Sequence, residues 1–251
     1  MNAHIFRGIS KKRILLISAV LIVLLCTPLF GQSFGGSISF FFPESLSYSS
    51  GSVSKEAGIS TSLGLGETIS IPVGFTYIKA SGFMPYEEND DGKLSRIDDE
   101  IWYTADTFIP YLRVQAHVPL GTLFVEGFAG IAGAWIVVPQ MNEGAMGRAF
   151  AERAGGSDDF YAFDDPSLDI SFGYGYQAGG SIGVQIEAIR VQITGIFTDI
   201  RAQTTASSDT VYKIDYEGGT DGTVTEQSGF EETFVSRLRG ISVGLGGSYS
   251  M

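Results

Sequence analysis

The sequence predicts an all-β protein, an eight-stranded antiparallel up-and-down transmembrane β-barrel. Apolar and polar residues alternate with a period of two in several segments, and eight strands can be drawn along the chain. Short and long connections follow one another between these segments, and the polar positions hold mainly Gly, Ser, Thr and Gln. A period of two is typical of strands, in which successive side chains point to opposite faces.

The clearest segment is "SFGYGYQAGGSIGVQI", residues 171–186. Its even positions are aromatic, aliphatic or small, and its odd positions are Ser, Gly or Gln. Gly175, Gly179 and Gly183 also have the G-x-x-x-G spacing of a membrane helix, and a loose dinucleotide-binding loop overlaps them. The alternation fits neither motif, and no helical pattern follows Ala178. The segment is therefore interpreted as a strand.

The connections predict how the strands are arranged. We expect strands at 36–46, 53–65, 68–81, 104–118, 122–138, 168–186, 190–204 and 233–251. The segment 122–138 is apolar on both faces, and Glu126 within it favours a strand over a helix. After the first hairpin, the turns "GLGE", "PLGT" and "EAIR" alternate with long loops at 81–106, 139–167 and 203–232. Short periplasmic turns and long extracellular loops are typical of a transmembrane barrel.

The polar face separates a membrane barrel from a soluble one. A lipocalin has eight alternating strands too, but it presents charged residues to water. Small uncharged residues suit the narrow lumen of an eight-stranded barrel, and the apolar face must then meet lipid. Four aromatic residues lie roughly ten to sixteen positions from the short turns, where an outer aromatic girdle belongs; they are Tyr77, Trp135, Tyr174 and Tyr176.

The N-terminus has the layout of a secretory signal peptide. A basic segment, 11–13, precedes the apolar run 14–25. We expect cleavage after Gly31, which divides the chain into a signal peptide, 1–31, and a barrel domain, 32–251. Cys26 is the only cysteine. It is either removed with the signal peptide or lipidated, since the residues before it weakly resemble the lipobox of a bacterial lipoprotein.

The last strand supplies a resemblance to a known family. Gly246, Tyr249 and Met251 stand where small eight-stranded outer-membrane proteins carry a Gly and spaced aromatic residues. Residues 34–251 thus resemble the family that includes OmpX, OmpW and the barrel domain of OmpA, although Met251 departs from its usual terminal aromatic. The resemblance implies residence in the outer membrane of a diderm bacterium, contact with its lipid, and recognition by the barrel-assembly machinery.

Two pairs of charged residues are candidate site residues. Arg113 and Glu126 are expected to point inward as near diagonal partners, either as a polar gate or as a buried ion pair. Arg237 and Arg239 share the parity of lipid-facing Ile241. A bulge at Gly240 would turn both arginines inward near the outer rim. Without a bulge they would point outward to acidic lipid head groups.

Acidic residues dominate the predicted loops. The formal net charge is -12, and the three long loops hold 21 of the 28 acidic residues, so nucleic acid is not an expected partner. Asn89, Asp91 and Asp98 approach the pattern of a calcium loop, but strands flank them instead of helices. They are weak cation-binding candidates within an acidic surface. No cofactor and no specific metal site are expected.

Two functions remain open from the sequence. The resemblance to OmpW-like proteins implies a narrow or hydrophobic conduit for small molecules. Alternatively, the barrel is a structural pedestal whose acidic loops bind a host or neighbouring surface. A lipid-active enzyme is disfavoured, because His117 is the one histidine left after processing and lies near a short turn, away from the outer leaflet.

Overall fold

The computed structural model describes residues 32–44, 53–65, 68–97, 100–153, 159–215 and 223–250. The predicted signal peptide with Cys26 lies outside these residues. The strands are β1 (Gln32–Pro43), β2 (Ser54–Gly64), β3 (Ile69–Glu88), β4 (Leu94–Arg96), β5 (Tyr103–Leu120), β6 (Leu123–Met141), β7 (Asp159–Asp164), β8 (Ser167–Ile170), β9 (Gly173–Ile186), β10 (Ile189–Asp215) and β11 (Thr223–Ser250), and the helix is α2 (Glu143–Arg153). No helix in the described ranges has the length and apolar character needed to cross a membrane.

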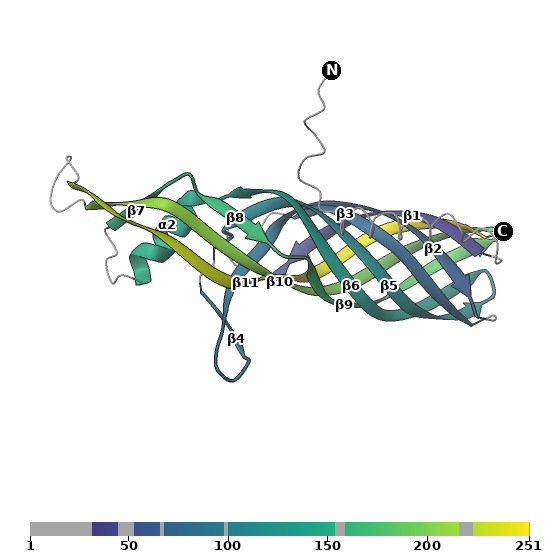
Figure 1. Ribbon diagram of the computed structural model, residues 1–251. Helices are drawn as coiled ribbons and strands as arrows, with labels where there is room; N and C mark the ends of the chain where they lie inside the picture. The colour runs from purple at the N-terminus through teal and green to yellow at the C-terminus, as the bar shows by residue number, and fades with distance from the viewer. Residues whose placement is uncertain are drawn as a thin grey trace, which may run out of the picture.

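Eight long strands form a closed antiparallel ring. Each strand of the series β1, β2, β3, β5, β6, β9, β10 and β11 pairs with the next, and β11 pairs with β1 to close the sheet. The tilted ribbons of this ring fill the right half of Figure 1, with the C-terminus at its right end. The all-β class, a ring of eight strands and its antiparallel order are therefore confirmed, whereas the predicted strand 168–186 is divided into β8 and β9.

The predicted alternation is also confirmed in the ring. On β9, Tyr174, Tyr176 and Ile182 are exposed on the outside, whereas Gln177 and Ser181 are buried inside. The inward glycines of the same strand leave room for large side chains of β6. A Cβ atom at Gly179 or Gly183 would lie within 3.0 Å of the rings of Phe128 and Phe124, respectively. Part of the space next to the small residues is therefore filled by these two phenylalanines.

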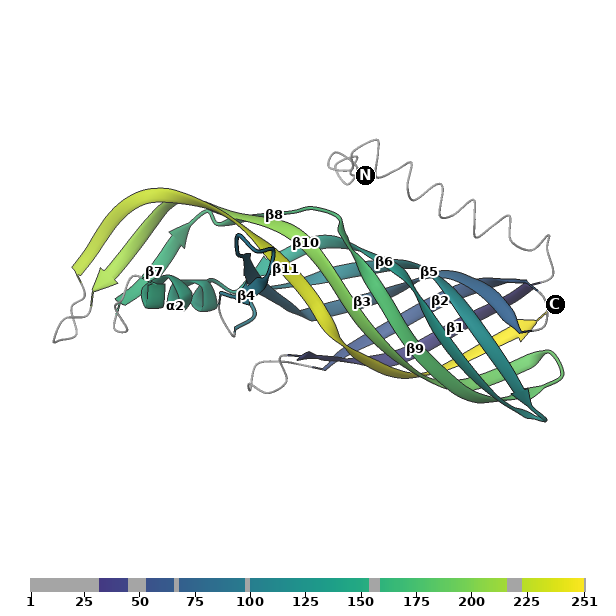
Figure 2. The ribbon, with the colours of Figure 1, turned by 90° about the horizontal axis from the view of Figure 1, so that it is seen from below.

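The segments predicted as long loops contain much regular structure. β3 continues to Glu88 and forms a hairpin with β4, and β10 and β11 continue as a paired ribbon far beyond the ring. α2 and β7 lie beside this ribbon at the end opposite the short turns (Figures 1 and 2). Asn142 caps α2, because its Oδ1 accepts a hydrogen bond of 3.2 Å from the amide of Ala145. We call β4, α2, β7, β8 and the parts of β3, β10 and β11 beyond the ring the extension.

The ring narrows towards the extension. β1 and β2 end at Pro43 and Ser54, and beyond them β3 pairs directly with β11, from Phe83–Leu238 to Tyr86–Val235. Six strands of the ring then remain around the interior. Since the width of a barrel grows with its strand number, this pairing constricts the lumen.

An apolar plug fills the constriction. Its inward side chains are at most 2% exposed and come from β1, β3, β5, β10 and β11; they are Phe41, Ile78, Ile109, Ile200 and Leu238. The same core continues into the extension through Trp102, Met146 and Phe234, each also almost fully buried. The plug therefore separates the polar lumen below it from the extension above it.

Candidate functional site

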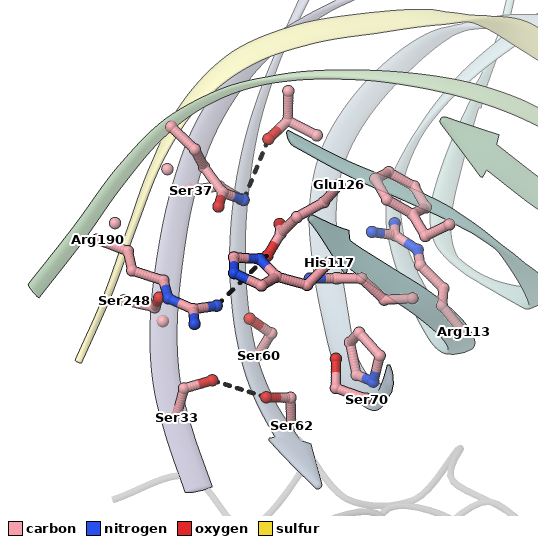
Figure 3. A pocket seen from close by; sticks show the side chains of 18 of the residues that line it. Ser33, Ser37, Ser60, Ser62, Ser70, Arg113, His117, Glu126, Arg190 and Ser248 are labelled. Atoms are coloured by element: carbon pink, nitrogen blue, oxygen red, sulfur yellow. Dashed lines mark hydrogen bonds and ion pairs between the residues drawn. The ribbon is translucent and has the colours of Figure 1, made fainter. Parts of the chain in front are cut away.

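A polar cavity of about 260 Å³ occupies the half of the lumen nearest the short turns. Many of its lining groups are serine hydroxyls from β1, β2, β3 and β11, and Figure 3 shows them facing one another across the lumen. Serine is frequent here because an inward side chain of an eight-stranded barrel must be small. The cavity reaches the ends of the strands, where Ser33, Thr68 and Ser250 line it.

Glu126 is the centre of a charged network in this cavity. Its Oε1 lies 3.2 Å from Nδ1 of His117 and 3.3 Å from Nη1 of Arg190, and its Oε2 accepts a hydrogen bond of 2.8 Å from Ser181. Arg190 also donates to Oε1 of Gln185 at 2.7 Å. The Glu126 side chain is 2% exposed and Arg190 24%, so this ion pair is screened from water on one side only. Figure 3 shows Glu126, His117 and Arg190 converging in the lumen.

Arg113 belongs to a second network, deeper in the lumen. Its Nη2 donates to Oε1 of Gln177 at 2.6 Å, and Nε2 of Gln177 donates to Thr198 at 3.0 Å. The guanidinium lies 3.8 Å from the ring centre of Tyr111. Glu56, also buried, is the acidic residue whose charge acts on Arg113, and its Oε2 accepts a hydrogen bond of 2.5 Å from Ser39.

Arg113 and Glu126 both lie inside the barrel, but they do not form the predicted pair. The cross-strand neighbour of Glu126 is His117, and that of Arg113 is Gly130. The two residues thus sit in different networks. Glu126 contacts His117 of the same hairpin and also Ser181 of β9 and Arg190 of β10, whereas Arg113 donates to Gln177 of β9. The expectation of an Arg113–Glu126 ion pair was wrong, because inward partners also come from the following strands of the ring, β9 and β10.

The chemistry of the cavity is that of a neutral polar compartment. Arg113 and Arg190 are balanced by Glu56 and Glu126. Glu126 stands between Ser181 and His117, whereas activation of a serine nucleophile needs the histidine in the middle. Ser39 donates to Glu56 and Ser181 to Glu126, and these contacts join neighbouring strands.

The weak cation-binding candidates lie in the β3–β4 hairpin. Asn89 donates from Nδ2 to Oγ of Ser95 at 3.1 Å, and Gly92 takes a positive φ of 71° in the turn. Asp91 is exposed, and Asp98 lies outside the described residues. No group of three His, Cys, Asp or Glu side chains in the described part of the chain is placed to hold a metal ion.

The two rim arginines point outward. Pairing of β11 with β10 runs without a register shift from Tyr249 to Phe230, and Pro43 pairs with Gly240 on the other side. The predicted bulge at Gly240 is therefore absent, and the expectation that Arg237 and Arg239 turn inward was wrong. Gly240 instead leaves room for Phe41, whose ring would lie 2.6 Å from a Cβ atom there.

The outward arginines meet acidic partners. Arg237 donates to both carboxylate oxygens of Asp199, at 2.8 and 2.6 Å. Nε of Arg239 lies 3.3 Å from Oε2 of Glu44 but has no hydrogen bond, and its guanidinium is 5.5 Å from the ring centre of Phe197.

The predicted girdle residues all belong to outward rows of the ring. Tyr77 packs against Phe108 with ring centres 5.4 Å apart, and Phe108 packs against Trp135 at 6.1 Å. On the next two strands of the ring, β9 and β10, Tyr174 is 75% exposed, and Tyr176 contacts Phe197 with ring centres 6.0 Å apart. The aromatic rings thus lie in cross-strand rows.

The residues of the predicted assembly signal lie at the end of β11. Gly246 pairs with Ser37 and Gln192, and the side chain of Tyr249 is exposed on the outside. Met251 lies outside the described residues. Recognition of this segment by the assembly machinery stays a prediction.

Sequence reasoning missed three charged residues. Glu56 and Arg190 occupy inward positions, and Asp199 occupies an outward position beside Arg237. The alternation did contain a signal for two of them, since Glu56 shares parity with Ser54, Gly58 and Ser60. Arg190 shares the inward parity of the residues that follow it on β10, but it adjoins the turn.

Comparison with known proteins finds likeness in structure alone. No family model matches the chain, and no curated protein matches it. The outer membrane protein OprG from Pseudomonas aeruginosa superposes with a TM-score of 0.50 at 10% identity, over 88% of this chain and 96% of OprG. A major outer membrane protein from Thermus thermophilus gives a TM-score of 0.31 at 9% identity, over 88% of this chain and 99% of that one. An outer membrane channel from Pseudomonas putida gives a TM-score of 0.24 at 10% identity, over 88% of this chain and 96% of that one. The first of these supports the fold of the ring.

Proposed function

We propose that the chain is an integral outer-membrane β-barrel protein that displays a folded extension at the cell surface and has no open aqueous pore. The observation that carries this proposal is the outer face of the ring. Its large apolar side chains are exposed on all eight strands, among them Ile38, Ile59, Ile69, Val114, Ile131, Ile182, Ile193 and Leu245. A water-soluble protein rarely exposes so continuous an apolar surface. Such a surface is stable in contact with the hydrocarbon chains of lipid.

The orientation follows from the family of folds and from the lengths of the connections. Barrels of this kind place short turns in the periplasm and long connections outside. The fold of OprG, described as an outer membrane protein, supports the same membrane. The partners are then outer-membrane lipid along the ring and the barrel-assembly machinery at β11. The extension faces a host or neighbouring surface.

The plug favours a binding or structural role over transport. Phe41, Ile78, Ile109, Ile200 and Leu238 pack without exposed surface where the ring narrows, so water has no continuous path. The extension above has its own packed core, which includes Phe163, Phe230 and Phe150 with ring centres 4.9–5.5 Å apart. The extension also exposes acidic side chains, among them Asp209, Glu226 and Glu231, which suit recognition of a cationic partner or diffuse binding of divalent cations.

A conduit for small molecules is the second candidate. The polar cavity already extends from the short turns to Arg113, and the layer above it is apolar. A conduit of this type would require the plug to move and would favour small apolar solutes.

Flux through reconstituted liposomes separates the two candidates. We expect arabinose to enter liposomes that contain the protein no faster than it enters empty ones. The double variant Ile109→Ala, Ile200→Ala, which removes part of the plug, should admit it if the fold is kept. Rapid arabinose or apolar-solute flux through the unmodified protein would contradict the closed barrel and favour the conduit.

A further inference from the structure

The outward face of β10 and β11 changes character abruptly near the extension. From the short turns upward, the outward row of β11 is Tyr249, Gly247, Leu245, Val243 and Ile241, and it then continues with Arg239 and Arg237. On β10 the corresponding row passes Phe197 and continues with Asp199 and Arg201. The arginines therefore begin where the lipid-facing apolar row of the proposed membrane barrel ends.

These arginines lie close together although they repel one another. Arg201 and Arg237 are direct cross-strand partners, a like-charge pair that destabilises a sheet unless an anion lies nearby. Asp199 supplies one negative charge, and Arg237 engages both of its oxygens. Burial alone would raise the pKa of the Asp199 carboxyl, but the hydrogen bonds of Arg237 and the charges of Arg237, Arg239 and Arg201 outweigh it and lower that pKa below its ordinary value. The charge of Arg237 is thus neutralised by Asp199, and the two hydrogen bonds join β11 to β10.

Arg201 and Arg239 remain available to a further anion. Arg201 is exposed, and its charge acts on Asp199, whose two carboxylate oxygens are both engaged by Arg237. Arg239 shares a half-exposed contact with Glu44, and its Nε, buried against the barrel, makes no hydrogen bond. The three arginines face two carboxylates, so this spot is positive in a chain whose net charge is -12.

An apolar depression lies on the same outward face, on the side of the arginines that is nearer the short turns. It is lined mainly by Ile38 and Phe40 of β1, Ile193 of β10, and Val243 and Leu245 of β11, and its floor is formed by glycines. Val243 is four residues from Arg239 along β11, a path of about 13 Å, within the depth of about 15 Å of one hydrocarbon leaflet.

We propose that Arg201, Arg239 and this depression form a binding site for a phosphorylated membrane lipid, with the phosphate on the arginines and an acyl chain in the depression. Arginine suits a phosphate because its planar donors bind two oxygens at once. The glycine floor lets a chain approach the backbone of β1 and β11. The inference rests on the proposed membrane barrel, but it adds a preferred lipid on one side of it.

Native mass spectrometry of the full protein in mild detergent tests the site. Phosphatidylglycerol and phosphatidylcholine with the same acyl chains are offered at equal concentration. We expect preferential retention of phosphatidylglycerol, with about fivefold weaker binding for each arginine removed and about 25-fold for Arg201→Gln, Arg239→Gln. Lys55→Gln, Lys79→Gln is the matched control, since it removes two exposed outward cations from β2 and β3 and should retain the lipid.

Three results would overturn the site. They are equal retention by the arginine variant, equal loss in the lysine control, and displacement of the lipid by millimolar inorganic phosphate, which would indicate a site for free phosphate. Each protein is also folded into phosphatidylcholine vesicles and run on a gel with and without boiling. A parent protein that never inserts would refute the membrane barrel itself, whereas insertion without lipid preference refutes the lipid site alone.

Discussion

Glu126 is the residue on which the polar half of the lumen depends. It holds His117, Arg190 and Ser181, which come from β5, β10 and β9. A carboxylate that is 2% exposed is tolerable only because these donors compensate its loss of water.

Glu126→Gln should therefore destabilise the barrel. The substitution removes the charge opposite Arg190 and leaves that guanidinium partly buried without its acidic partner. Removing one partner of a buried pair costs about 3–5 kcal/mol, and because Arg190 is 24% exposed we expect about 2–3 kcal/mol. Urea titration in lipid vesicles measures this change in the free energy of unfolding. Glu226→Gln, an exposed acid of the extension, is the control and should stay within about 0.5 kcal/mol; equal losses in both variants would refute the role of Glu126.

A second residue-scale prediction compares two exposed apolar side chains. Ile182 on the ring is 55% exposed and Val224 on the extension is 60% exposed. Ile182→Arg should destabilise the protein by about 2–4 kcal/mol, because the arginine would face hydrocarbon, whereas Val224→Arg faces water and should be almost neutral. The measurement is again unfolding in vesicles, and a neutral Ile182→Arg would mean that the ring does not face lipid.

The sequence predicted the direction of individual side chains better than their partners. Parity placed Arg113 and Glu126 inward, because direction depends on the position along one strand. Their partners Gln177 and Arg190 lie on strands far away in sequence, and only the tilt and register of the closed ring decide which inward groups meet. Parity also placed Arg237 and Arg239 outward. The bulge at Gly240 was not needed, because Asp199 and Glu44 lie outside the ring beside Arg237 and Arg239, respectively.

At the scale of elements, the strands of the ring were predictable and the extension was not. The ring strands alternate between aliphatic and small polar residues, which gives a clear period. The paired ribbon of β10 and β11 beyond the ring is rich in Ser and Thr, as in the contact between Thr205 and Thr233 at 3.0 Å. Such strands are stabilised by cross-strand pairs and backbone hydrogen bonds, and they show little hydrophobic period.

Asn142 links α2 to the rest of the extension. Its side chain caps the helix and also donates to the carbonyl of Ile101 at 3.2 Å. Asn142→Ala should cost about 1 kcal/mol and loosen α2 without affecting the ring. Hydrogen exchange should become faster in Glu143–Arg153 and unchanged in β9; faster exchange in both elements would contradict an independent extension.

A substitution at Gly240 tests how closely the side chains pack in the constriction. An added Cβ would lie 2.4 Å from the carbonyl oxygen of Phe42 and 2.6 Å from the ring of Phe41, so Gly240→Ala should displace the plug and cost about 1–3 kcal/mol. Gly195→Ala is the matched control, since nothing lies within 4 Å of its added Cβ. Thermal unfolding in detergent compares them, and equal stability of the two variants would argue against close packing at Phe41.

At the scale of the whole molecule, the sequence did not allow us to predict that the lumen is closed. The alternation predicted eight strands and a narrow interior, and it left open whether that interior is filled. The answer depends on β3 pairing with β11 beyond the ends of β1 and β2, a contact between segments far apart in sequence. This pairing divides the molecule into a polar compartment, an apolar plug and a folded extension.

The central claim is that the ring spans a membrane with its even β9 side chains in lipid. Single cysteines at 174–186, each carrying a spin label after reconstitution in liposomes, test it most directly. If the ring spans the membrane, dioxygen accessibility should alternate with a period of two, high at Ile182 and Val184 and low at Ser181 and Gln185. A water-soluble relaxation agent should reach labels on the extension at Val224 but not at Ile182. Free access of that agent to Ile182 and Val184 would contradict a membrane-spanning barrel.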